Sequence, residues 1–266
     1  MCLDVCIIAY RKAGLERIAA AAHPRIPGVR YVVAWQYADD SPEDVPSALS
    51  GRDDVVIIPN TTRGGGANRQ VALDNAVAPL ILLSDDDVEY LEEDILRLLQ
   101  TFHDHPECAF LLMKCRSVAY PREYPDYEFR ADQAPKGYFV GGPEIAFRRE
   151  AIIEKKICFN PLFGRGAKFC AGEDALFVDR MIKSGLCGRF IPQFICSHEA
   201  ESTGIRELTS PDFIRAKGAM FCHIHPKSWP ARMITHALRL SKSLPASIKY
   251  IRHWLKGVKD LHLSTH

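Results

Sequence analysis

The sequence lacks the features that mark secreted, disulfide-bonded and membrane-spanning proteins. No segment reaches the roughly 18 consecutive apolar residues that a membrane-spanning helix needs. The first residues carry no basic segment of the kind that opens a secretory signal. The nine cysteines are odd in number, scattered, and never form a C-x-x-C pair, a pattern that favours reduced, buried thiols. We therefore expect a cytoplasmic protein.

The common phosphate-loop signatures and an excess of basic charge over most of the chain are also missing. The run from Gly64 to Gly66 fits neither G-x-x-x-x-G-K-S/T nor G-x-G-x-x-G. Residues 231–266 hold seven Lys or Arg and one acid, a charge of +6, which leaves −5 for the rest because the whole chain carries +1. An acidic body with a basic C-terminal end argues against a nucleic-acid partner.

The apolar runs that are present predict one large α/β domain. Of the 266 residues, 47% are hydrophobic and 25% are charged, which is ordinary for a folded protein with a sizeable core. Continuous apolar runs predict buried strands at 5–10, 31–35, 55–59, 80–83, 109–113, 145–147 and 189–195, and the segment 139–143 predicts a strand with a tight turn. Segments with helical spacing lie between them, at 15–22, 67–77, 95–102 and 149–155. This order predicts a doubly wound, mostly parallel sheet flanked by helices.

The strand predicted at 80–83 runs directly into three carboxylates, Asp85, Asp86 and Asp87. Adjacent acids repel one another, so a bound cation is one way to stabilise them. In open α/β sheets, ligands bind just beyond the carboxyl ends of the strands. Asp85 and Asp87 would point the same way in an extended chain, which turns Asp86 aside. The alternative is a solvated acidic turn that caps a helix beginning near Glu92.

Three further places carry side chains that suit either catalysis or ordinary structure. Glu173 and Asp174 open a predicted helix, where two acids are either helix-end stabilisers or catalytic groups. Arg69 lies in the first turn of the helix after the triple glycine, and it is either a ligand contact or a surface arginine. His198 follows the last predicted strand, and it is either a metal ligand or a polar loop residue.

Residues 211–266 form a basic, amphipathic helical region. Apolar residues recur at helical spacing from Met233 to Leu238 and from Ile248 to Val258, and they alternate with basic residues at Arg232, Arg239, Lys242, Lys249, Arg252, Lys256 and Lys259. With Trp and Tyr at its edge, this pattern suits helices that lie on an anionic membrane. A pair of helices packed on the body with a solvated basic face is the alternative.

Taken in order, these segments resemble the family 2 glycosyltransferases, which have the GT-A fold. The resemblance extends from the strand that begins at Val5 to about Gly204. It rests on three matches in the expected order: a first strand that ends in Ala9-Tyr10-Arg11, a glycine-rich segment with an arginine (Gly65 to Arg69) before the D-x-D strand end Asp85-Asp86-Asp87, and Glu173-Asp174 at the start of a later helix that contains Arg180.

The resemblance implies a metal-dependent, inverting transfer from a nucleoside-diphosphate sugar, with a UDP-sugar as the favoured donor. Asp174 is then the general base, and Glu173 orients the acceptor. The metal, Mn²⁺ or Mg²⁺, takes its protein ligands from Asp87, Asp85 and His198. Contacts with the nucleotide sugar are expected from Ala9, Tyr10, Arg11, Gln36, Gly65, Arg69, Asp85 and Asp86.

Two places depart from the family's pattern. Where the family commonly has an acid that contacts the nucleobase, this chain reads Trp35-Gln36-Tyr37. The family's Arg-Asn pair is here Arg69-Gln70. Both departures bear on which nucleotide is bound, whereas the metal and general-base positions match the family.

The resemblance also implies a domain organisation and a setting. A GT-A catalytic domain covers 1–210, with a nucleotide-sugar half at about 1–115 and an acceptor half at about 116–210, and the helical region follows at 211–266. The acceptor would be a glycan or a lipid-linked glycan in bacterial-type cell-surface polysaccharide synthesis. The enzyme would be cytoplasmic and peripheral on the inner face of the cell membrane.

Two other classes of function stay open. A nucleotidyltransferase on a similar sheet usually has a basic, glycine-rich signature after the first strand, where this chain has only Gly14. A noncatalytic sugar- or membrane-binding module would make Asp174 dispensable.

Overall fold

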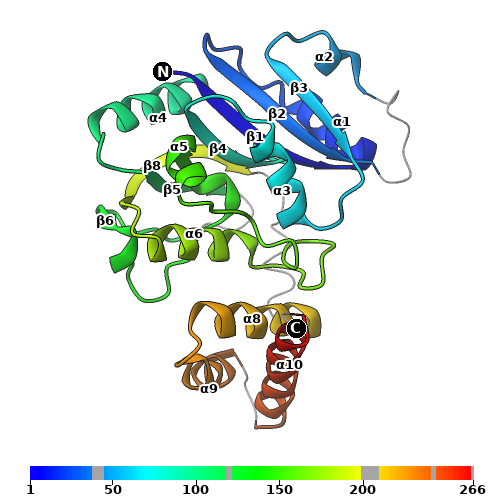
Figure 1. Ribbon diagram of the computed structural model, residues 1–266, viewed down its shortest axis with the longest axis vertical. Coiled ribbons are helices and arrows are strands. Elements are labelled where there is room, and N and C mark those ends of the chain that lie inside the picture. Colours follow the sequence, from blue (N-terminus) through cyan, green and yellow to red (C-terminus); the bar gives the residue numbers. More distant parts are fainter. Residues whose placement is uncertain (38–44, 118–121, 199–209, 241–243, 265–266) are drawn as a thin grey trace.

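The computed structural model describes residues 1–37, 45–117, 122–198, 210–240 and 244–264. These residues form an eight-stranded sheet in the order β3-β2-β1-β4-β7-β5-β8-β6, with helices around it (Figure 1). The strands are β1 Leu3–Tyr10, β2 Val29–Gln36, β3 Val55–Asn60, β4 Leu80–Asp85, β5 Phe110–Ser117, β6 Phe129–Arg130, β7 Ile145–Arg148 and β8 Gly188–His198. The helices are α1 Arg11–Ala21, α2 Ser47–Ser50, α3 Gly65–Asp74, α4 Glu92–Asp104, α5 Arg149–Glu154, α6 Glu173–Lys183, α8 Pro211–Ile224, α9 Trp229–Leu240 and α10 Leu244–His262.

The sheet is mostly parallel, which confirms the fold class expected from the sequence. Strand β1 pairs in parallel with β2 and β4, β2 with β3, and β5 with β8. Strand β7 is antiparallel to both β4 and β5, and β6 is antiparallel to β8. Because β1 and β4 are parallel, with Ile8 opposite Asp85, the ends of these two strands lie side by side at one edge of the sheet.

Of the strand and tight turn predicted at 139–143, the strand is wrong and the turn is confirmed. Residues 139–141 have no regular structure, and a 3-10 turn, η3, covers Gly142–Glu144 before β7 begins. The Glu144 carboxylate accepts a hydrogen bond from the Gly141 N–H at 3.1 Å, which ties the turn to itself. The separate strand predicted at 145–147 is confirmed as β7, Ile145–Arg148.

Helices cover both faces of the sheet. Side chains of α1, α2 and α4, such as Ile18, Leu49 and Phe102, share one buried cluster with alternate residues of β1. Side chains of α3, α5 and α6 share the cluster on the other face, which includes Phe177. This two-layered burial is the reason that β1 reads as a continuous apolar run and not as an alternating one.

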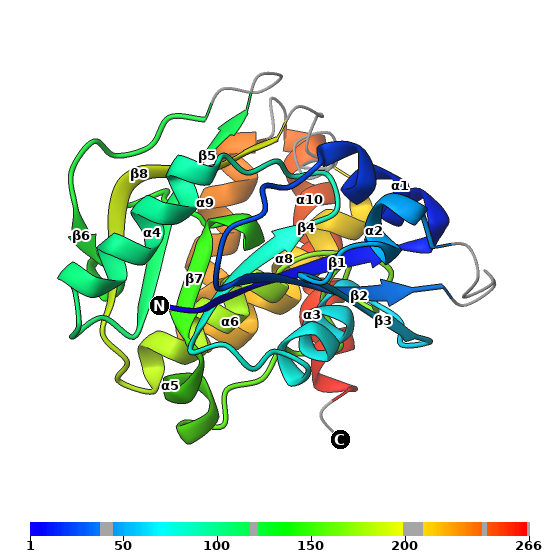
Figure 2. The same cartoon turned by 90° about the horizontal axis from the view of Figure 1, so that it is seen from above.

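A third buried cluster joins α8, α9 and α10 to the body. It contains Trp254, which is fully buried, and Phe163 and Phe169 from the loop that precedes α6. The three helices lie below the sheet in Figure 1 and behind it in Figure 2. The helical C-terminal region expected from the sequence is therefore present and packed on the body. The predicted boundary at 210 adjoins residues 199–209, which, like Lys242, lie outside the described residues.

Candidate active site

The three acids after β4 have three different partners. Asp85 Oδ1 lies 2.8 Å from Arg69 Nη2, Asp86 Oδ2 lies 2.7 Å from Arg17 Nη2, and Asp87 Oδ2 lies 3.1 Å from His198 Nε2. Asp86 and Asp87 lie in a turn just beyond the end of β4, and Asp86 pairs with α1 while its two neighbours pair with other segments. The capping alternative is wrong, because α4 begins at Glu92 with Leu91 as its N-cap and has no side-chain cap.

Arg69 joins the end of β4 to the start of α6. Its side chain is only 2% exposed, so the surface-arginine alternative is wrong. Besides the ion pair with Asp85, its Nε lies 3.0 Å from Asp174 Oδ1, and its Nη1 donates to the Ser84 carbonyl at 3.2 Å. Burial lowers the pKa of Arg69, but the surrounding carboxylates more than offset this effect, and the net pKa is raised. The guanidinium is therefore a fixed positive charge between two acids.

Asp174 and Glu173 form the first turn of α6, but neither side chain caps the helix. The N-cap is Gly172, and it has no side-chain hydrogen bond. Burial raises the pKa of Asp174, Arg69 opposes this rise, and the backbone N–H of Gly142 donates to the carboxylate. Asp174 Oδ1 has no hydrogen-bond partner among the described residues, because the ion pair with Arg69 Nε is short but poorly aligned. A carboxylate with a raised pKa, whose Oδ1 is ion-paired but not hydrogen-bonded, is suited to receive a proton.

Glu173 lies beside Asp174 in the same turn. Burial, followed by the charge of Asp174, raises the pKa of Glu173 to about 7. Two adjacent carboxyl groups in one buried place do not both ionise easily. Arg69 favours the ionised form of Asp174, with which it forms an ion pair. The arrangement therefore places a protonatable group next to the candidate base near neutral pH.

The triple glycine brings α3 and the loop before α6 into backbone contact. The Gly65 N–H donates to the Arg165 carbonyl at 2.9 Å, and the Gly66 N–H donates to the Phe163 carbonyl at 3.0 Å. A Cβ on Gly66 would lie 2.6 Å from the Asn160 carbonyl oxygen, so no larger residue fits without displacing the loop. These N–H groups are used within the protein. A contact between Gly65 and the nucleotide sugar stays a prediction. It would use other atoms of Gly65, or it would require the loop to shift.

The residues predicted at the end of β1 lie next to the acids of β4. Tyr10 is exposed, and its N–H lies 3.4 Å from Asp86 Oδ2. Arg11 stacks over the Tyr10 ring and has a φ of +55°, a conformation that costs energy in a residue with a side chain and is often found at functional sites. Both remain predicted donor contacts.

Two other predicted donor residues are buried and hold the backbone around the site. Ala9 is buried and its carbonyl accepts from Asn68 Nδ2 at 3.3 Å, while Asn68 Nδ2 also donates to the Ala34 carbonyl at 3.0 Å. Gln36 donates to the carbonyls of Thr62 and Gly64 at 2.8 and 3.3 Å. Sequence reasoning missed Asn68, although a polar side chain in an otherwise apolar helix face is a usable signal.

The family resemblance implies a divalent ion, and the donor set at Asp87 fits one. A carboxylate oxygen and an imidazole nitrogen lie together, both partly accessible, and such ions commonly take few protein ligands plus phosphate oxygens. Burial raises the pKa of Asp87, but His198 more than offsets it, so the net pKa is lowered and the acid stays ionised. Asp85 is instead held by Arg69. Elsewhere in the described residues, His105, Glu107 and Cys108 bring three possible metal-ligand atoms within 4.8 Å of one another. At that place Arg189 already supplies a positive charge, 3.9 Å from the Glu107 carboxylate.

Gly142 is a site residue that sequence reasoning missed. A Cβ at this position would lie 2.1 Å from Arg69 Nη2, and its N–H donates to Asp174. The only sequence signal is that it is one of two adjacent glycines before Pro143. Gly142 therefore leaves the space that the Arg69 guanidinium occupies.

We expect Gly142→Ala to lower turnover by about 10²-fold, because the added methyl displaces Arg69 and with it both Asp85 and Asp174. The matched control is Gly141→Ala, whose added Cβ would meet its nearest neighbour at an ordinary 3.8 Å. Steady-state kinetics and a thermal melt on both variants test this. Normal turnover in folded Gly142→Ala would contradict the packing of Arg69 described above.

The comparisons with known proteins bear on the family and the fold of the chain. A family model described as "Glycosyl transferase family 2" matches residues 13–156. Among solved structures, residues 1–349 of TarS from S. aureus superpose with a TM-score of 0.63 at 14% identity, covering 99% of this chain and 92% of that one. The same protein in complex with UDP-GlcNAc gives a TM-score of 0.64 at 14% identity, with the same coverage. A search of curated proteins finds no match.

Proposed function

Because the chain belongs to glycosyl transferase family 2, and is therefore a glycosyltransferase that uses a nucleotide sugar, we propose that it is a metal-dependent, inverting enzyme with a UDP-sugar as donor. The observation that carries the proposal is the link through Arg69, which holds Asp85 at the end of β4 and Asp174 at the start of α6 at 2.8 and 3.0 Å. One buried guanidinium thus fixes the predicted donor side and the predicted base relative to each other.

The chemistry assigns a role to each side chain. The bond between the anomeric carbon of the sugar and the β-phosphate oxygen breaks, and the acceptor oxygen forms a new bond to that carbon from the opposite side. The acceptor proton passes to Asp174, whose Oδ1 is ion-paired with Arg69 but accepts no hydrogen bond from the described residues. Glu173, the neighbouring acid, orients the acceptor. Asp87 and His198, with Asp85 beside them, would hold Mn²⁺ or Mg²⁺, which neutralises charge on the leaving diphosphate.

The donor proposal draws on the similar structures as well as on the site. TarS is described in complex with UDP and with UDP-GlcNAc. The exposed Tyr10 and the neighbouring Arg11 and Asp86 form the edge where a nucleotide would lie, beyond the carboxyl ends of β1 and β4. Gln36, which replaces the family's acid after the second strand, is engaged with Thr62 and Gly64.

The proposal extends to the acceptor and the setting. Residues 1–115 would bind the donor, 116–210 the acceptor, and 211–266 would keep the enzyme near its substrate. The acceptor is a glycan or a lipid-linked glycan of cell-surface polysaccharide synthesis. The enzyme would work in the cytoplasm, peripheral to the inner face of the cell membrane, where such acceptors are presented.

A screen of nucleotide sugars tests the proposal directly. Purified protein is incubated with each sugar nucleotide, with Mn²⁺, Mg²⁺ or a chelator, and released nucleoside diphosphate is measured. We expect one UDP-sugar to give metal-dependent release, and Asp174→Asn to slow this release by about 10²- to 10⁴-fold. Release of pyrophosphate from a nucleoside triphosphate and a sugar phosphate would instead indicate a nucleotidyltransferase. Sugar binding without turnover, unchanged in Asp174→Asn, would indicate a noncatalytic module.

A further inference from the structure

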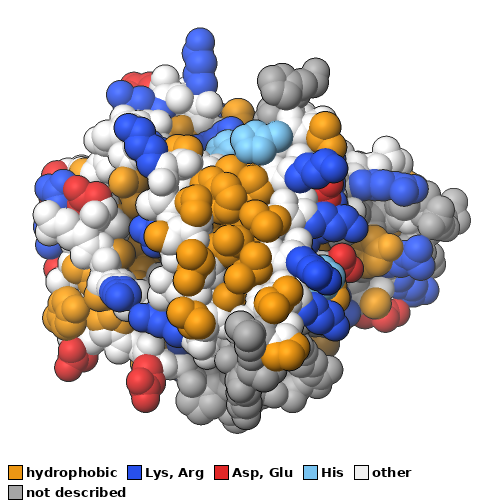
Figure 3. All heavy atoms as spheres, turned by 90° about the horizontal axis from the view of Figure 1, so that it is seen from below, with side chains coloured by type: hydrophobic (Ala, Val, Ile, Leu, Met, Phe, Trp, Pro, Cys, Tyr) orange, Lys and Arg blue, Asp and Glu red, His pale blue; other side chains and the backbone are white. Residues whose placement is uncertain are grey.

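Helices α9 and α10 expose an apolar surface at the end of the molecule farthest from the sheet. Ile234 and Leu238 on α9 are 51% and 69% exposed, and Ile248 and Leu255 on α10 are 45% and 43% exposed. Figure 3 shows the apolar patch at the centre of this end, with Lys and Arg side chains on both sides of it. We call this surface, with its basic residues, the α9–α10 face; its basic members are Arg232, Arg239, Lys249, Arg252, Lys256 and Lys259, all exposed.

Folding does not require the exposed apolar residues of this face. The opposite sides of the same helices supply Met233, Ala237, Trp254 and Val258 to the buried cluster that joins the helices to the body. Each helix therefore has one apolar stripe that packs inward and further apolar side chains that face water. Apolar surface beyond what the core uses marks a site of interaction.

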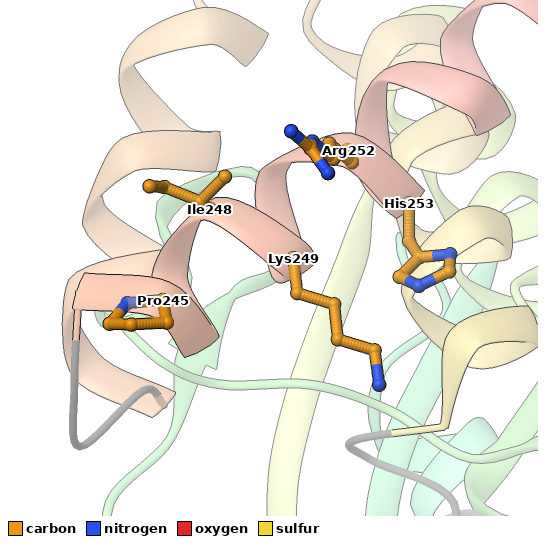
Figure 4. A pocket seen from close by; sticks show the side chains of 5 residues that line it. All are labelled: Pro245, Ile248, Lys249, Arg252 and His253. Carbon is orange, nitrogen blue, oxygen red and sulfur yellow. The ribbon is translucent and has the colours of Figure 1, made fainter.

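The charge on this face has one sign. In the described parts of α9 and α10 the only acid is Asp260, and it pairs with Arg215 of α8 at 2.6 Å. A shallow hollow of about 640 Å³ on α10 is lined by apolar and basic side chains together: Pro245, Ile248, Lys249, Arg252 and His253 (Figure 4). The partner of this face must therefore be both apolar and anionic.

We propose that the α9–α10 face lies on the surface of an anionic lipid bilayer. The apolar side chains enter the region between headgroups and acyl chains, and the basic side chains contact lipid phosphates. The described helices include none that is long and apolar enough to cross a membrane, so the contact is parallel to the surface. The inference deepens the proposed function, since it names the partner that would bring the enzyme to a lipid-linked acceptor.

Charge complementarity favours lipid over the other occupants. A symmetric contact between two copies of this chain would bring six basic side chains against another six, without acids between them. A nucleic acid would use the basic residues but not the apolar centre formed by Leu238 and Leu255. An anionic bilayer satisfies both parts of the face at once.

The test measures binding of the full-length protein to phosphatidylcholine vesicles with and without phosphatidylglycerol, by flotation. We expect binding to require the anionic lipid and to weaken with salt. Arg252→Gln should lower the partition coefficient about fivefold, since one basic residue near an anionic surface contributes about 1 kcal/mol. The double substitution Leu238→Glu and Leu255→Glu should abolish binding. Truncating the helices is a poorer test, because it would remove Trp254 from the third cluster.

Matched controls lie on the body. Leu96→Glu on α4 changes a leucine that is 46% exposed, and Lys155→Gln removes an exposed basic residue after α5. Both should bind like the unchanged protein. Equal binding to neutral vesicles, no binding at all, or no loss in the face variants would overturn the inference, as would a dimer in solution that the double substitution dissolves. Nucleoside diphosphate release without lipid is measured in parallel: it stays normal in the face variants, and its absence from the unchanged protein counts against the proposed function alone.

Discussion

Replacing Asp174 by asparagine is expected to lower turnover by about 10²- to 10⁴-fold, the usual effect of losing a general base. Asparagine keeps the size of the side chain and can still accept the Gly142 N–H, but it cannot take the acceptor's proton. Donor affinity should change little, because Asp85 and Asp87, not Asp174, follow the strand end that faces the donor. Turnover is measured by nucleoside diphosphate release and affinity by calorimetry.

The matched control for this variant is Asp179→Asn. Asp179 lies on the same helix, and its carboxylate forms an ion pair with Lys183 at 2.7 Å. Its turnover should stay normal. Asp174→Asn also leaves Arg69 with Asp85 as its remaining close partner, so a lower thermal midpoint is expected as well. Near-normal turnover in Asp174→Asn would remove this residue from the role of base, whatever happens to the thermal midpoint.

Asp87→Ala is expected to abolish the metal-dependent part of donor binding and to leave the fold intact. Asp87 is the acid that contacts His198, and its lowered pKa keeps it ionised at neutral pH. Its side chain is partly exposed at a strand end, so its loss leaves no cavity in the core. Calorimetry with UDP, in Mn²⁺ and in a chelator, separates the metal-dependent binding from the rest.

The comparison for Asp87 is Asp53→Ala, which removes an acid that is 93% exposed and pairs only loosely with Arg25 at 3.3 Å. It should bind UDP with Mn²⁺ like the unchanged protein. Wild-type affinity in Asp87→Ala under the same conditions would show that the metal, if bound, takes its ligands elsewhere. His198→Ala then becomes the next variant to measure, since the two side chains are in direct contact.

The strand ends and helix starts of the site could be predicted because each is encoded locally. The apolar run before Asp85 and the helical spacing after Asp174 place both acids at the correct ends of β4 and α6. The parallel order of the strands follows from the alternation of strands and helices. Which partner each acid selects could not be predicted, because Arg69 meets Asp174 across a gap in sequence that no local pattern spans.

The glycines also show that tertiary partners could not be predicted from the sequence. Gly65 is expected to contact the nucleotide sugar, yet the N–H groups of Gly65 and Gly66 donate to the carbonyls of Arg165 and Phe163. Gly142 lies in the expected turn and also makes room for the Arg69 guanidinium. A glycine in a sequence indicates a close approach, but the group that approaches is determined by the tertiary structure.

The amphipathic pattern of the C-terminal helices has two interpretations, helices that lie on a membrane and helices that pack on the body. A helix with two apolar sides is compatible with both. One side of α10 packs inward through Trp254, while Ile248 and Leu255 remain exposed among basic residues. A periodic pattern reports how many apolar positions a helix has, and it does not report how many of them the body covers. How many apolar positions the body covers is known only from the burial of each side chain in the folded chain.

The shared core of Trp254, Phe163 and Phe169 limits how this protein can be engineered. Phe163 also accepts the Gly66 N–H through its carbonyl, so the loop that leads into α6 rests on the C-terminal helices on one side and on α3 on the other. Replacing α9 and α10 by other helices would remove the side chains against which Phe163 and Phe169 of this loop pack. The C-terminal region is therefore not an interchangeable module, and a chimaera that keeps an ordered Asp174 must keep the aromatic contacts beneath it.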